Sequence, residues 1–410
     1  MARVGNLFIA GVEDHDGIYK CGVSYELLRN SPVPLTYTTQ QGDWNVEFTT
    51  TSNDVVARTT HEMSYDAVQS GGFSAIQEAL DVLSVKGILS TNLKNPCKSN
   101  ICIYRKDGKA ILTVYSLFEI SIGLQAELTI TDASGKEVKS PPPQEPKWNE
   151  SFRYYRLSQC SSDLFDAYRN LFLAFEALLN SICKKKRSEG ECIWLQRALS
   201  VVAAETSLDR LIPTGSEDPV SYIVRSQYKD VRCKLLHAKF PDAQLPHAQL
   251  SPQDINQAYS ELVRIWRQIA GAYFWVPTGG SCVTFIGFEM MMKNAFQSGA
   301  TIHYTPDTSP PAGDDTKASP SGLPSYEFAL STYAGQVRPG TVRIIGTESV
   351  ATGSESYKIP IHRLCTAMSS ALFGVAYIES GLTILGVDEW ECIHDFRLIN
   401  SSQPKIEFST

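Results

Sequence analysis

The chain has 410 residues, of which 43% are hydrophobic and 20% are charged, and its formal net charge is −7. This composition excludes an intrinsically disordered protein, and the length predicts two or three domains. No run approaches about 18 consecutive apolar residues, and the N-terminal run shows no signal-peptide core. We therefore expect a cytoplasmic protein that does not span a membrane.

The charge is distributed unevenly along the sequence. Residues 1–150 carry 13 basic and 18 acidic side chains, residues 151–276 carry 16 and 13, and residues 277–410 carry 8 and 13. Only the middle third has an excess of positive charge. Such a local excess attracts a polyanion to that third, which is compatible with an RNA partner.

The ten cysteines are scattered singly, without a C-x-x-C pair or a histidine at zinc-finger spacing. The nearest approach to a zinc pattern is His362 with Cys365 and Cys392 with His394, which we interpret as packing residues. We therefore expect reduced thiols, no metal site and no cofactor.

The first part of the chain, residues 1–140, has the pattern of a β-rich α+β domain. Short runs rich in Thr, Val, Ile and Tyr predict strands, and Asp107-Gly108 between two of them predicts a two-residue hairpin turn. Residues 70–84 predict one helix, with Gly87 as its stop signal. Residues 141–150 follow as a proline-rich linker, because successive prolines fix φ and remove backbone donors.

Residues 151–276 change to a helical periodicity of 3.6. Helices are predicted over 158–186, 191–206, 218–239 and 252–272, and four helices with short connections favour a bundle. Residues 277–410 predict a C-terminal α+β segment with a flexible loop at 305–324 and a helix at 360–373. The sequence thus predicts an α+β multidomain protein, in which a central all-α four-helix bundle is flanked by two β-rich α+β regions.

The third predicted helix carries the pattern R-x4-H, formed by Arg232 and His237. The opening helix contains the run AYRNLFLAFEALLNSI at 167–182. Together they resemble the HEPN superfamily of helical ribonucleases and nucleic-acid-associated modules, in particular its Apea-like and MauJ-like branches. The resemblance covers about 120 of the 410 residues.

This resemblance implies RNA cleavage without a metal, leaving 2',3'-cyclic phosphate ends. His237 would take the proton of a 2'-hydroxyl, because the unperturbed pKa of histidine lies near neutral pH. Arg232 would stabilise the phosphorane-like transition state with its two parallel donors. Residues of second rank for substrate binding or positioning are Arg225, Lys229, Cys233, Lys234 and Glu176.

Five residues of a continuous α-helix correspond to about 500°, or 140° around the axis, so we expect Arg232 and His237 to point in different directions. The resemblance implies a cleft between two copies of the domain, and therefore a homodimer. One functional hypothesis is an endoribonuclease, by analogy a stress or anti-phage defence effector whose flanking regions sense a trigger or a partner protein.

The alternative is a non-catalytic HEPN module that mediates dimerisation and binds RNA or protein. Cys233 favours this alternative, because active family members carry Asn, Asp or His after the arginine. The intact Arg232 and His237 favour the enzyme.

Overall fold

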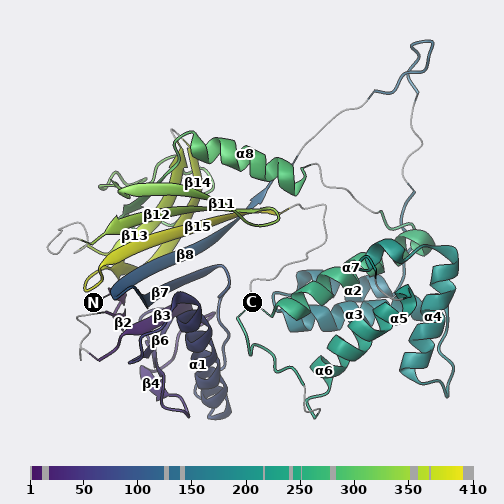
Figure 1. Ribbon diagram of the computed structural model, residues 1–410, viewed down its shortest axis with the longest axis horizontal. Helices are drawn as coiled ribbons and strands as arrows, with labels where there is room; N and C mark the ends of the chain where they lie inside the picture. The colour runs from purple at the N-terminus through teal and green to yellow at the C-terminus, as the bar shows by residue number, and fades with distance from the viewer. Residues whose placement is uncertain are drawn as a thin grey trace. The chain divides into compact units, whose positions relative to one another are not determined.

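The computed structural model describes residues 2–11, 18–123, 129–138, 144–215, 218–239, 243–250, 252–277, 283–350, 359–368 and 371–399 (Figure 1). Contacts within the chain divide it into two compact units. We call them the β unit, within residues 1–121, 247–250 and 283–399, and the helical unit, within residues 122–246 and 251–282. No helix in the described residues is long and apolar enough to cross a membrane.

A nine-stranded sheet forms the larger layer of the β unit. Its strands, in spatial order, are β11 (Leu330–Arg338), β12 (Thr341–Ser349), β15 (Glu389–Ile399), β8 (Lys109–Ser121), β7 (Ser99–Lys106), β3 (Cys21–Glu26), β6 (Asp54–Thr59), β5 (Asn45–Phe48) and β4 (Leu35–Thr38). Lys106 pairs with Lys109 across the predicted hairpin turn. Asp107 and Gly108 have φ values of 52° and 78°, which confirms that turn.

Strands β8 and β15 are parallel neighbours in this sheet, with Val114 opposite Cys392 (Figure 1). The first and last thirds of the sequence therefore share one sheet. The predicted arrangement of two β-rich regions around a central bundle is wrong. The mostly apolar run at 110–114 of β8 is typical of a buried strand, but this local pattern does not reveal that the strand's partner lies about 280 residues away.

A six-stranded sheet is the second layer of the β unit. Its strands, in spatial order, are β10 (Tyr326–Glu327), β9 (Thr301–Thr305), β13 (Ile361–Met368), β14 (Ala371–Thr383), β1 (Ala2–Val4) and β2 (Leu7–Ala10). The helix predicted at 360–373 is wrong, because Ile361–Met368 pairs with both β9 and β14. The apolar residues at 361, 364, 365 and 368 fit helical spacing, but they also fit a strand that is buried on both faces.

Two helices cover the sheets of the β unit. Helix α1 (Tyr65–Val85) confirms the helix predicted at 70–84 and begins five residues earlier, after Ser64. Its Gly72 lies so close to Val23 that a Cβ atom there would be 2.2 Å from that side chain. Helix α8 (Phe285–Gln297) packs on β11 and β12.

The segment after β9 forms a loop, as predicted for 305–324, but part of it is buried. Asp307 is 1% exposed and accepts hydrogen bonds from Ser319 and Ser321. Asp315 forms a 2.6 Å ion pair with Arg363, whose side chain is fully buried. These bonds hold the loop against the six-stranded sheet.

The helical unit contains α2 (Ser151–Cys160), α3 (Leu164–Ile182), α4 (Glu191–Glu205), a short 3-10 turn (Asp209–Leu211), α5 (Pro219–Ile223), the π-helix η2 (Val224–Arg232), α6 (Cys233–Leu236) and α7 (Gln253–Phe274). The single helix predicted at 158–186 is interrupted, because the Asp163 side chain caps a new helix by accepting from the Asp166 amide. The predicted third helix is irregular. The described residues therefore contain no regular four-helix bundle, and this part of the fold prediction is also wrong.

Candidate active site

The π-helix η2 ends at Arg232 and determines where this residue lies. Its Gln227 is 1% exposed, and the buried Tyr168 hydroxyl of α3 donates a 2.8 Å hydrogen bond to the Gln227 main-chain carbonyl. A side chain that bonds a helix carbonyl stabilises a departure from the regular α-helical ladder. π-Helical segments occur frequently at functional sites.

Arg232 and His237 lie together in one chain, with Arg232 Nη1 3.3 Å from His237 Nε2. The expectation that the helix would hold them apart is wrong, because α6 ends at Leu236 and His237 has φ −127° and ψ 78°. The chain turns there, and the imidazole comes back to the guanidinium. For Arg232 to donate to Nε2, the neutral ring must carry its proton on Nδ1.

Glu191 holds the other side of the Arg232 guanidinium. Its Oε1 lies 3.1 Å from Arg232 Nη2, and its Oε2 accepts a 3.0 Å hydrogen bond from the Tyr228 hydroxyl. Glu191 is the first residue of α4, where the helix dipole favours a negative charge. The guanidinium also lies 5.3 Å from the Tyr228 ring centre and 5.8 Å from that of Phe172.

Glu176 lies beside Glu191. We call Arg232, His237, Tyr228, Glu191 and Glu176 the cluster, and the two glutamates are its acidic side. Burial and the hydrogen-bonded Glu191 carboxylate raise the pKa of Glu176 to about 8. The pKa of Glu191 is lowered by the hydrogen bond from Glu176 and by the charge of Arg232. At neutral pH the pair therefore shares one proton, with Glu176 as the donor and Glu191 as the anion facing Arg232.

The loop before α4 carries the exposed basic run 184–187. Arg197 fixes this loop by donating to both carboxylate oxygens of Glu189, at 2.8 and 2.7 Å, and to the Lys184 carbonyl at 2.9 Å. The hydrogen bond from Arg197 lowers the pKa of Glu189 to about 2. The charge of Lys185 acts on both Glu176 and Glu191, so the basic run adjoins the cluster.

The other residues predicted to bind or position the substrate lie around this cluster rather than within it. Arg225 and Lys229 are exposed on η2, and the Arg225 guanidinium lies 5.7 Å from the Tyr222 ring centre. Cys233 is a half-buried free thiol. The Lys234 carbonyl accepts a 3.1 Å hydrogen bond from the amide of residue 244.

Glu191 and Tyr228 were not among the residues that the sequence singled out. Tyr228 precedes Arg232 by four residues, a spacing that places two side chains on one side of an α-helix. Glu191 is 41 residues from Arg232, and an acidic residue at a helix N-terminus is too common to mark a site.

No group of three or more His, Cys, Asp or Glu side chains in the described residues could hold a metal ion. Cys392 Sγ lies 3.2 Å from His394 Nε2, and the His394 Nδ1 lies 2.7 Å from Thr366 Oγ1. Burial lowers the pKa of His394 to about 3, so the ring is neutral. His362 is elsewhere on β13, with Nδ1 3.0 Å from the Ile378 carbonyl.

Comparisons of the chain with models of protein families, with curated proteins and with solved structures gave no match.

Proposed function

We propose that the helical unit is a metal-independent endoribonuclease of the HEPN type, with Arg232 and His237 at its reaction centre. The observation that supports this proposal is the 3.3 Å contact between Arg232 Nη1 and His237 Nε2 at the end of η2. Cleavage at a 2'-hydroxyl requires two groups, a general base and a cation that binds the phosphate. Here these two groups are in direct contact.

The reaction begins when the His237 imidazole accepts the proton of a ribose 2'-hydroxyl. The 2'-oxygen attacks the adjacent phosphorus, and the bond from phosphorus to the 5'-oxygen breaks. Arg232 stabilises the additional negative charge on the phosphoryl oxygens. The 5'-oxygen leaves as an alcohol with a proton from water, and the imidazolium returns its proton to the resulting hydroxide.

Glu191 and Tyr228 act as positioning residues for Arg232. The Glu191 carboxylate binds Nη2, which leaves Nη1 directed toward His237 and toward a phosphate that reaches the same place. Tyr228 holds the second oxygen of that carboxylate. A guanidinium that is already oriented loses little further freedom when the phosphate binds.

The basic run 184–187 provides contacts for the RNA backbone. Its four side chains are exposed, and it belongs to the loop that Arg197 and Glu189 fix beside Glu191. Phosphate contacts of this kind supply affinity without sequence preference. They would guide a single strand toward Arg232.

The proposal is tested with single-stranded RNA and two matched pairs of variants. His237→Ala and Arg232→Ala should each lower the rate of cleavage at least a hundredfold, as expected when a general base or a transition-state cation is removed. The controls are His61→Ala and Arg264→Ala, at exposed positions outside the cluster. The two controls should cut like the wild type.

Circular dichroism should show that all four variants remain folded. Wild-type cleavage by His237→Ala would rule out the proposed base. Equal losses in His61→Ala would indicate a general loss of structure, and retained cleavage in both His237→Ala and Arg232→Ala would indicate another base or a contaminating nuclease.

The non-catalytic alternative is favoured by Cys233 in the motif and by the ion pair between Arg232 and Glu191, which uses part of the guanidinium. In that case the unit would dimerise and bind RNA or protein without cutting. Two results together would establish this alternative. The wild type would not cut RNA, and an Arg232→Ala/His237→Ala protein would bind RNA and dimerise like the wild type. Light scattering of both proteins measures the predicted homodimer.

A further inference from the structure

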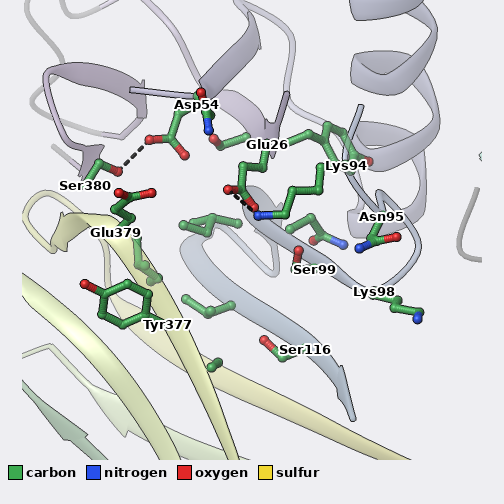
Figure 2. A pocket seen from close by; sticks show the side chains of 18 of the residues that line it. Glu26, Asp54, Lys94, Asn95, Lys98, Ser99, Ser116, Tyr377, Glu379 and Ser380 are labelled. Carbon is green, nitrogen blue, oxygen red and sulfur yellow. Dashed lines mark hydrogen bonds and ion pairs between the residues drawn. The ribbon is translucent and has the colours of Figure 1, made fainter. Parts of the chain in front are cut away.

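The β unit contains a cavity of about 730 Å³, which lies within the range of roughly 300–1,000 Å³ that small-molecule sites occupy (Figure 2). Its floor is formed by β3, β7 and β8 of the nine-stranded sheet, and its opposite wall is residues 376–380 of β14. Gly374 of β14 allows the two walls to approach, because a Cβ atom there would lie 2.8 Å from the Phe118 ring.

The floor of the cavity is polar where two packed sheets are ordinarily apolar. The strand register places Ser99 opposite Ser116 and Ser24 opposite Ile101, so these side chains share the face of the sheet that lines the cavity. Figure 2 shows Ser99 and Ser116 on neighbouring strands, across from Tyr377 on β14.

Two of these serines are largely buried residues that line the cavity, and their hydroxyl groups have no internal partner among the described residues. Ser24 is 2% exposed and Ser116 is 7% exposed, and neither hydroxyl forms a hydrogen bond within the described part of the chain. Both hydroxyls lie on the floor of the cavity, where they can donate to and accept from a ligand. A polar ligand in the cavity would supply the missing partners.

The charges that line the cavity disfavour an anionic ligand. Lys94 is paired with Glu26 at 2.9 Å, and Lys98 is paired with Glu119 at 2.9 Å (Figure 2). Asp54 accepts a hydrogen bond from Ser380 at 2.5 Å. Burial raises the pKa of Asp54, and the nearby carboxylates of Glu26 and Glu379 raise it further.

The remaining polar groups are neutral and can donate or accept. Hydroxyl groups are both donors and acceptors, and amide side chains offer one of each kind, so they match the hydroxyl groups of a ligand. The rings of Tyr377 and Phe118 provide apolar faces on the wall and the floor. The lining includes the amide side chains of Asn30, Asn53 and Asn95, whereas the lining residue Asn100 accepts a hydrogen bond from Gln69 of α1.

We infer that this cavity binds a small neutral saccharide, with the hydroxyls of Ser24 and Ser116 bonded to sugar hydroxyls. The site lies wholly within the β unit and is independent of the proposed ribonuclease. It gives the chain a site for a soluble small molecule.

The test is a titration of the full chain with neutral sugars, namely glucose, galactose, mannose, ribose and N-acetylglucosamine, followed by saturation-transfer NMR and calorimetry. At least one should bind. Ser24→Ala and Ser116→Ala should each weaken binding roughly tenfold, which corresponds to about 1.4 kcal/mol. Neither variant should lower the melting temperature of the free protein, because neither hydroxyl has an internal partner.

Ser31→Ala is the matched control. Ser31 is 3% exposed and outside the cavity, and its hydroxyl donates a 2.5 Å hydrogen bond to the Val33 carbonyl. This variant should be less stable and should bind the sugar normally. The inference is overturned if no neutral sugar binds at millimolar concentration, or if binding survives both cavity variants. It is also overturned if AMP or spermidine binds in place of a sugar, and Ser24→Ala and Ser116→Ala weaken the binding of that ligand.

Discussion

Glu176 and Glu191 place two carboxyl groups beside a single arginine in the helical unit. One carboxylate neutralises Arg232, and the other must hold a proton because two adjacent half-buried carboxylates repel each other. The protonated Glu176 keeps Glu191 charged and directed at the guanidinium. The charge state of this pair therefore affects both the stability of the unit and the orientation of Arg232.

The stability of the helical unit should depend on pH through Glu176. The folded-state pKa of about 8 lies above the unfolded value of about 4.3, so the folded state binds more protons between these values. The free energy of unfolding should therefore fall as the pH rises from 5.5 to 8.5, by roughly 1 to 2 kcal/mol after allowance for solvent screening. Urea denaturation across this range measures the slope.

Glu176→Gln is the matched variant for this measurement. It keeps the shape of the side chain and cannot lose a proton, so its unfolding free energy should change less over the same pH range. The same slope in both proteins would show that another group titrates. The pKa of Glu191 is shifted in the opposite direction, and the stability that this shift contributes is lost only as the pH falls through the lowered pKa. Glu191 therefore affects stability at lower pH than Glu176.

The π-helix is the element on which the geometry of the site depends. Tyr168→Phe removes the hydroxyl that bonds the Gln227 carbonyl and should cost about 1 to 3 kcal/mol. It should also lower RNA cleavage at least tenfold, because η2 can then return toward an α-helix and turn Arg232 away from Glu191. Chemical denaturation and cleavage rates are measured on the same preparation.

Tyr259→Phe separates the local effect from a general loss of stability. Tyr259 is also fully buried, and its hydroxyl bonds Ser158 at 2.8 Å, away from η2. This variant should lose a similar amount of stability and should cut RNA normally. Equal cleavage by both variants would contradict the role assigned to the π-helix.

The helices and strands also differ in how well the sequence predicted their type and their bounds. Helices α4 and α7 lie within two residues of their predicted bounds, because an apolar stripe with period 3.6 is a local signal. The strand β13 was mistaken for a helix, since a strand buried on both faces has no distinctive period. The sequence identified Arg232 and His237 by their spacing. It could not reveal that the turn at His237 brings the imidazole to Arg232, or that Arg232 lies against Glu191.

At the scale of the whole molecule, the β unit is assembled from two segments that are far apart in the sequence. Strand β15 covers one edge of β8, and β14 pairs with β1. Separated fragments 1–123 and 283–410 should each be unfolded or aggregated, because each would expose an unpaired strand edge. Mixing them during refolding should restore a folded complex, which NMR dispersion and light scattering detect. A fragment that folds alone as a monomer would contradict this topology.

If Arg232 and His237 cleave RNA at the 2'-hydroxyl as proposed, the chemical nature of the cut ends distinguishes this reaction from other cleavage. The wild type is incubated in excess chelator with two RNAs that differ by a single 2'-O-methyl group at the main cleavage position. We expect 2',3'-cyclic phosphate and 5'-hydroxyl ends from the unmodified RNA and no cut at the methylated position. Cleavage at the methylated position, 5'-phosphate ends or no cleavage of either RNA would contradict the proposed reaction.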